Sequence, residues 1–165
     1  MKLGLISDTH DDVENVKKAI RIFKNNNINS VIHLGDYISP PIIRLFKGMK
    51  LIGVFGNNDG YKTGLIKAFN EIKGEIKGDF CITVIDGLKI AIYHGEFREI
   101  SEALAKSGNF DIVCTGHLHK SNKIIYDKTL WISVGSAHQY LTKDYAPQIG
   151  ILNTTSKEFK FIDLK

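Results

Sequence analysis

The chain has few cysteines, prolines and tryptophans, and none of its apolar segments is long. Its 165 residues include two cysteines, three prolines and one tryptophan. Cys81 and Cys114 lie in separate apolar segments, which predicts reduced core thiols and excludes a disulfide framework. The chain also lacks internal repeats, low-complexity tracts and linker-like stretches. We therefore expect one domain, residues 1–165, large enough to bury a full hydrophobic core.

A membrane-spanning segment is also missing. No apolar run approaches the roughly 20 residues that a helix needs to cross a bilayer. The N-terminus begins at once with the apolar segment 3–6, without the charged and apolar regions of a signal peptide. We therefore expect a cytoplasmic protein with no membrane partner.

Dense blocks of basic residues are absent, although the net charge is +4 and the pI is about 9.0. Without a basic stripe interleaved with aromatic residues, a dedicated nucleic-acid binder is not favoured. The mild positive bias fits a phosphate-bearing substrate. Four lysines could form either an electropositive rim or an ordinary solvated face: Lys62, Lys67, Lys73 and Lys77.

Short apolar segments alternate with helix-like segments in the first half of the chain. Asp11 or Asp12 can cap the first helix, and Asp11 and Glu14 have the spacing of a capping box. The order strand, helix, strand, helix, strand implies parallel strands with right-handed crossovers. The predicted elements are strands at 3–6, 31–34 and 51–55, a helix from the 11–12 cap to the 25–27 turn, and a short helix at 40–46.

The second half favours antiparallel pairing. The Asp86-Gly87 pair is a strong turn signal and predicts a hairpin. Segment 60–78 is ambiguous and fits either a helix or a mobile flap. The predicted elements are hairpin strands at 80–85 and 89–93, a helix from about 97 to 107, a strand at 111–114, and antiparallel candidates at 123–126, 130–134, 148–153 and 158–162. Together the halves predict an α/β fold with two mixed sheets flanked by helices.

Residues of the types that commonly bind metal ions follow five of the apolar segments. They offer two carboxylates, one amide and four imidazoles, a set that suits two divalent cations. Ligands two residues apart at a strand end project to the same side. Taken singly, each could be a helix cap, a turn residue or a core histidine, but their joint placement favours a two-metal site. The candidate ligands are Asp8, His10, Asp36, Asn57, His94, His117 and His119.

The order of these runs resembles that of the calcineurin-like metallophosphoesterases, and the compact size resembles their small bacterial and archaeal phosphodiesterase branch. The resemblance extends from Leu3 to about Gly135. It implies a four-layer αββα sandwich. The runs are Asp8-Thr9-His10, Gly35-Asp36, Gly56-Asn57-Asn58-Asp59, His94-Gly95 and Gly116-His117-Leu118-His119.

The resemblance also implies how the ligands divide between two metal ions. One ion would be held by Asp8, His10, Asp36 and His119. The other would be held by Asp36, Asn57, His94 and His117, so that Asp36 bridges the pair. Mn²⁺ or Ni²⁺ are the expected activators, with Zn²⁺ or Fe as alternatives.

Asn58 departs from the family pattern, which often has histidine at this position. An amide cannot act as a general acid near neutral pH, although it can donate a hydrogen bond to a phosphate oxygen. We therefore expect Asn58 to bind substrate and activity to be weak on substrates with poor leaving groups. The small branch is similar in often lacking this histidine.

Three further residues have open roles. His33 lies within a predicted strand, which favours a core position over a direct metal ligand. His138 follows a turn after a strand and could contact substrate. Asp59 could orient a neighbouring group or simply occupy a turn.

The resemblance implies hydrolysis of a small phosphodiester by a hydroxide that two metal ions share, about 3.5–4 Å apart. Four metal charges, two carboxylates and one hydroxide leave a centre of plus one, which a diester monoanion neutralises. A nuclease acting on nucleic-acid ends is one alternative. A non-catalytic interaction scaffold, like the retromer subunit of this fold, is another. A homo-oligomer is compatible with the sequence, which does not identify the natural substrate.

Overall fold

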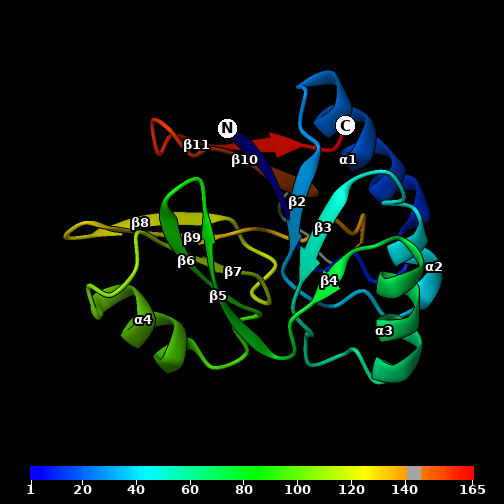
Figure 1. Ribbon diagram of the computed structural model, residues 1–165, viewed down its shortest axis with the longest axis horizontal. Coiled ribbons are helices and arrows are strands. Elements are labelled where there is room, and N and C mark those ends of the chain that lie inside the picture. Colours follow the sequence, from blue (N-terminus) through cyan, green and yellow to red (C-terminus); the bar gives the residue numbers. More distant parts are fainter. Residues whose placement is uncertain (141–145) are drawn as a thin grey trace.

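The computed structural model describes residues 1–140 and 146–165, and the chain forms four layers (Figure 1). Two sheets pack face to face, with helices on both outer sides. A separate buried apolar cluster fills each of the three interfaces between adjacent layers. This arrangement confirms the predicted αββα sandwich. The helices are α1 (Val13–Asn25), α2 (Pro40–Arg44), α3 (Lys62–Glu71) and α4 (Arg98–Lys106).

The first sheet has six strands in the order β11-β10-β1-β2-β3-β4. Its strands β1 to β4 are parallel, because α1, α2 and α3 form the crossovers between them. Strand β10 pairs antiparallel with β1, and β11 pairs antiparallel with β10. The strands are β1 (Lys2–Ile6), β2 (Ser30–His33), β3 (Lys50–Gly53), β4 (Glu75–Ile76), β10 (Gln148–Asn153) and β11 (Phe159–Asp163).

The second sheet has five strands in the order β5-β6-β7-β9-β8. Its central strands β6, β7 and β9 are parallel, and the edge strands β5 and β8 are antiparallel to their neighbours. The segment 130–134 was expected to be antiparallel; β9 is antiparallel to β8 but parallel to β7. The strands are β5 (Phe80–Ile85), β6 (Leu88–Tyr93), β7 (Ile112–Thr115), β8 (Asn122–Tyr126) and β9 (Thr129–Ser133).

Helix α1 is capped by the second of the two candidate aspartates. The Asp12 side chain accepts a hydrogen bond from the Asn15 backbone N–H at 3.0 Å. The Asp11 carboxylate instead accepts hydrogen bonds from Ser39, in the loop before α2. The predicted capping box between Asp11 and Glu14 therefore does not form.

The ambiguous segment 60–78 contains helix α3, followed by the short strand β4. Leu65 and Phe69 of α3 lie in the buried cluster against the first sheet. Lys62 forms an exposed ion pair with Asp79, as expected of a solvated face. None of the helices in the described ranges is long and apolar enough to cross a membrane. Of the loop 138–147, which the sequence leaves open, residues 141–145 lie outside the described residues.

Candidate metal centre

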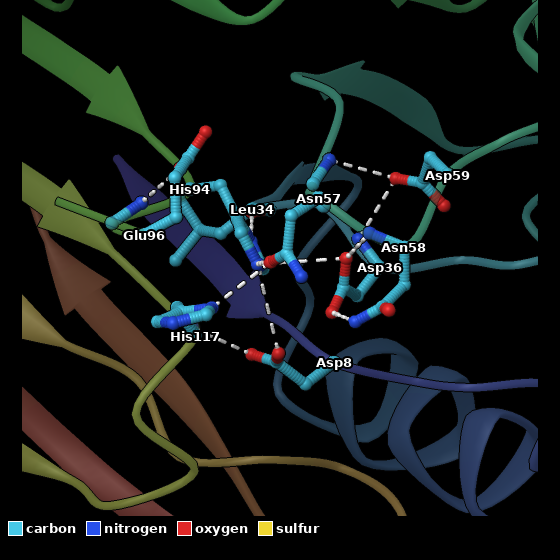
Figure 2. Close-up of polar contacts among 12 residues, drawn as sticks. Asp8, Leu34, Asp36, Asn57, Asn58, Asp59, His94, Glu96 and His117 are labelled. Carbon is cyan, nitrogen blue, oxygen red and sulfur yellow. Dashed lines mark hydrogen bonds and ion pairs between the residues drawn. The ribbon is translucent and has the colours of Figure 1, made fainter.

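The predicted ligands come together where parallel strands of both sheets end. Asp8 and His10 follow β1, Asp36 follows β2, and Asn57 follows β3. From the second sheet, His94 directly follows β6, and the loop after β7 carries the remaining two histidines. Because the carboxyl ends of parallel strands meet at one edge of each sheet, the sandwich brings these side chains to one place. Figure 2 shows five of them pointing toward a common space: Asp8, Asp36, Asn57, His94 and His117.

The two carboxylates lie among the imidazoles at short distances. Asp8 Oδ1 is 3.2 Å from His119 Nε2 and 3.8 Å from His10 Nε2. Asp36 lies between two histidines, with Oδ2 3.3 Å from His10 Nε2 and Oδ1 3.5 Å from His94 Nε2. Asp36 therefore contacts one histidine from each of the two ligand sets that the family resemblance implies.

The amide oxygen of Asn57 joins the two remaining histidines. Asn57 Oδ1 lies 3.0 Å from His94 Nε2 and 3.0 Å from His117 Nδ1 (Figure 2). The other ring nitrogen of His94, Nδ1, is 2.7 Å from the Leu34 carbonyl oxygen. This second contact fixes the ring so that Nε2 faces the centre.

Asn58 contacts a predicted ligand in this structure. Its backbone N–H donates to Asp36 Oδ1 at 3.0 Å, and its side-chain amide donates to Asp36 Oδ2 at 2.8 Å (Figure 2). Both oxygens of Asp36 are thereby oriented by one neighbouring residue. Asn58 was predicted to bind substrate, and its observed partner is the carboxylate that lies between the two halves of the site.

Five of the seven predicted ligands adopt left-handed backbone conformations. Their φ angles lie between 39° and 67°, a region of backbone conformation that residues other than glycine rarely adopt. This conformation turns each chain segment sharply at the strand end, so that the side chain points back into the centre. This backbone was not predicted from the sequence, although Asp and His are enriched among the non-glycine residues that adopt positive φ angles. The five are Asp8 (φ 51°), His10 (39°), Asp36 (58°), His117 (67°) and His119 (52°).

Asp59 holds the two loops of the first sheet together. Its Oδ1 accepts from the backbone N–H groups of Tyr37 and Ile38, at 2.8 and 3.0 Å. Its Oδ2 accepts from those of Asp36 and Gly56, at 2.9 and 2.8 Å. The residue is 2% exposed. Of the two roles left open by the sequence, Asp59 therefore orients its neighbours.

Glycines allow the loops to approach one another closely. A Cβ atom on Gly56 would lie 2.1 Å from Asp36 Oδ1. A Cβ atom on Gly116 would lie 1.9 Å from Ser7 Oγ and 2.8 Å from Asp8 Oδ2. Any side chain at either position would therefore displace a predicted ligand.

Without metal, the carboxylates and histidines of the centre stabilise each other's charged forms. Burial raises the pKa of Asp8, but the nearby His10 and His119 side chains outweigh it and hold that pKa below its usual range. Burial likewise opposes ionisation of Asp36, whose pKa is lowered by His10 and His94. In return, Asp36 and Asp8 overcome burial and raise the pKa of His10, and that of His94, to about 9.

Three buried polar atoms at the centre have no hydrogen-bond partner among the described residues: Ser7 Oγ, Asp8 Oδ1 and His10 Nε2. Asp8 Oδ1 and His10 Nε2 lie 3.8 Å apart. Buried polar groups normally form hydrogen bonds, so a carboxylate oxygen that faces an imidazole nitrogen without one fits a cation between them. Two groups have ligand atoms all within 4.8 Å of one another: Asp8, His10 and His119, and Asp8, Asp36 and His94.

His33 has a core position, as the sequence favours. Its Nε2 lies 3.1 Å from Thr9 Oγ1, and its Nδ1 accepts from the Gly35 N–H at 3.3 Å. The ring centroid is 4.0 Å from that of Tyr37. Burial lowers the pKa of His33 to about 3, so the ring is neutral and supports the loop that carries Asp36.

The loop after β9 also borders the centre. The His138 ring lies 6.1 Å from the His10 ring, and its Nδ1 accepts from the Tyr140 N–H at 3.0 Å. Ser136, which the sequence did not single out, donates from Oγ to the Asp8 carbonyl oxygen at 2.8 Å. A short serine in a turn carries no signal of such a long-range contact.

Comparisons with known proteins agree with this geometry. Residues 1–157 match the calcineurin-like phosphoesterase superfamily domain. The chain is 40% identical to phosphodiesterase MJ0936 of Methanocaldococcus jannaschii, over the full length of both proteins. A solved structure of an archaeal phosphodiesterase superposes with a TM-score of 0.92 at 40% identity and covers 99% of each chain. Vps29 of Chaetomium thermophilum shares the fold, with a TM-score of 0.73 at 15% identity over 98% of this chain and 93% of Vps29. The chain belongs to the calcineurin-like phosphoesterase superfamily.

Proposed function

We propose that this chain is a metal-dependent phosphodiesterase that holds two divalent metal ions at the centre described above. The observation that carries the proposal is Asp8 Oδ1, which has no hydrogen-bond partner among the described residues and is buried among imidazole nitrogens where both sheets meet. The relative that is 40% identical is named a phosphodiesterase, which supports the same activity.

The ligand assignment is the one that the family resemblance implies, and the contacts of Asp36 with His10 and His94 support it. Asp8, His10 and His119 would hold one ion, and Asn57, His94 and His117 the other, with Asp36 contributing to both. Mn²⁺ or Ni²⁺ are the favoured ions, because the set combines imidazoles with carboxylate and amide oxygens. When bound, such ions lower the pKa of a water molecule and offset negative charge on the phosphate.

The residues around the centre favour a diester over a monoester. Only two carboxylates face the proposed ions, so the centre retains a small positive charge that suits a singly charged phosphate. Asn58 supplies no imidazole that could protonate a poor leaving group, and its amide keeps Asp36 in place. We therefore expect small phosphodiesters with good leaving groups to be the preferred substrates.

The test is hydrolysis of bis(p-nitrophenyl) phosphate by the Asp36→Asn variant with saturating Mn²⁺. An amide in place of the carboxylate removes a negative charge shared by both ion sites, so we expect turnover to fall by about 100-fold or more. Asp79→Asn is the control, because Asp79 is exposed and pairs only with Lys62. Full turnover by Asp36→Asn would show that the reaction does not depend on this centre.

A further inference from the structure

A cavity lies beside the proposed metal centre. It has a volume of about 270 Å³ and is lined by side chains from the start of α4, the loop after β7, and strands β8 and β9. The residues that matter for its chemistry are Arg98, Leu118, Lys120, Asn122, Ile124 and Trp131. None of these six residues is a predicted metal ligand.

One loop separates this cavity from the metal centre. Along the loop after β7, His117 and His119 face Asn57 and Asp8 in the centre. The residues that alternate with them, Leu118 and Lys120, line the cavity instead. Consecutive Cα atoms are about 3.8 Å apart, so residues that line the cavity lie next to the predicted ligands in the chain. The backbone of this loop is therefore the wall between the cavity and the predicted ligands.

The floor of the cavity is apolar and rigid. Trp131 is 8% exposed, and its Nε1 donates to Thr115 Oγ1 at 3.0 Å. The Tyr126 ring stacks with it at a centroid distance of 6.3 Å. Leu118, which is 55% exposed, and Ile124 complete an apolar surface. Such a surface suits a flat organic group such as a nucleobase.

The rim of the cavity is cationic. Arg98 stands at the first position of α4 and is exposed, and Lys120 lies across the cavity from the other loop. Glu102, one turn along α4 from Arg98, is already ion-paired with Lys106. A guanidinium at the mouth of an apolar cavity suits a phosphate, which it can bind through two hydrogen bonds.

We infer that this cavity is a subsite for one nucleotide unit of the substrate, with the base on the apolar floor and a terminal phosphate at Arg98. The volume is slightly below the 300–1,000 Å³ typical of small-ligand pockets, so it accepts one such unit and no more. The inference rests on the proposed phosphodiesterase function and narrows its substrate class to small nucleotide diesters that carry a terminal phosphate.

Binding can be measured without metal or turnover, because Trp131 is the only tryptophan of the chain. We expect AMP, titrated in EDTA with excitation at 295 nm, to change the tryptophan fluorescence saturably. Adenosine should bind about tenfold more weakly, because it lacks the phosphate. In Arg98→Ala the two ligands should bind with equal affinity. Arg21→Ala, at an exposed arginine on α1, should behave like the wild type.

An activity measurement separates failure of the subsite from failure of the proposed function. The wild type should cleave the p-nitrophenyl ester of thymidine 3′-phosphate, which has a good leaving group, with a KM about tenfold lower when the thymidine also carries a 5′-phosphate. Arg98→Ala should lose this difference, whereas Arg21→Ala should keep it. A preference that survives in Arg98→Ala, or AMP binding that does not depend on Arg98, overturns the subsite. Absence of all diester hydrolysis by the wild type overturns the function instead.

Discussion

Asp59 offers the sharpest test of how the site is built. The Asp59→Ala variant removes the acceptor of four backbone N–H groups, which belong to the loops that carry Asp36 and Asn57. Three of these hydrogen bonds are buried, and the one from Ile38 is partly buried. Each buried donor left without a partner costs about 1–3 kcal/mol. Water entering the space left by the carboxylate would satisfy some of them. Because this water offsets part of the cost, we expect the free energy of unfolding to fall by about 3 kcal/mol.

The Asp59→Asn variant distinguishes the hydrogen bonds from the mere presence of a side chain. Each carboxylate oxygen accepts two of the four bonds. An amide keeps one oxygen and turns an NH₂ group toward the other two donors. The expected loss is therefore about 2 kcal/mol or more, and it should lie between the wild type and Asp59→Ala.

Urea unfolding at pH 8 measures both losses, since Asp59 is ionised there even though burial raises its pKa. Asp79→Ala is the matched control, because Asp79 and its partner Lys62 are 69% and 47% exposed. An exposed pair of this kind contributes at most about 1 kcal/mol. An Asp59→Asn variant within 0.5 kcal/mol (roughly the scatter of a surface substitution) of the wild type would refute the reasoning.

Two further predictions concern the neighbours of the ligands. Gly116→Ala should weaken Mn²⁺ binding by about tenfold or more in calorimetry, because the new methyl group displaces the Asp8 carboxylate. Gly60→Ala is the control, since the space around Gly60 is open, and it should bind Mn²⁺ as the wild type does. Equal affinities of the two variants would contradict the close packing at Gly116. His33→Gln should flatten the pH dependence of stability. The folded-state pKa of His33 is about 3, below the ordinary 6.5, so its neutral form stabilises the fold above pH 6.5 and this contribution is lost as the pH falls toward 3. Between pH 6.5 and 5 the wild type should lose about 2 kcal/mol more than the variant in urea unfolding, and parallel curves would exclude the effect.

The sequence predicts the layer architecture and the order of the ligand-bearing strand ends. Both are local patterns. A short apolar run predicts a buried strand, and an Asp-x-His or His-x-His after it places two ligands on the same side. The family resemblance, now confirmed, added the division of the sheets into a sandwich. The direction of β9 was not predictable, because it depends on β7, which is distant in sequence.

The fine geometry of the site was beyond the sequence for a different reason. Asp residues adopt left-handed φ angles more often than most, but at Asp8 the turn also depends on a hydrogen bond from its N–H to the Gly35 carbonyl oxygen in another loop. Asp59 shows the same limit, because a carboxylate in a turn gives no sign that it accepts hydrogen bonds from residues 36–38. The choice of Asp12 over Asp11 as helix cap likewise depends on Ser39, in a loop 28 positions away.

The left-handed backbone of five predicted ligands disfavours the folded chain when no metal is bound. At about 1 kcal/mol each, the five residues cost roughly 5 kcal/mol, which is as large as the whole net stability of many domains. A cation that bound only the folded chain, at the site proposed above, would offset this strain by mass action. The population of unfolded chains, and hence exposure to proteolysis, would then rise when divalent metal became scarce.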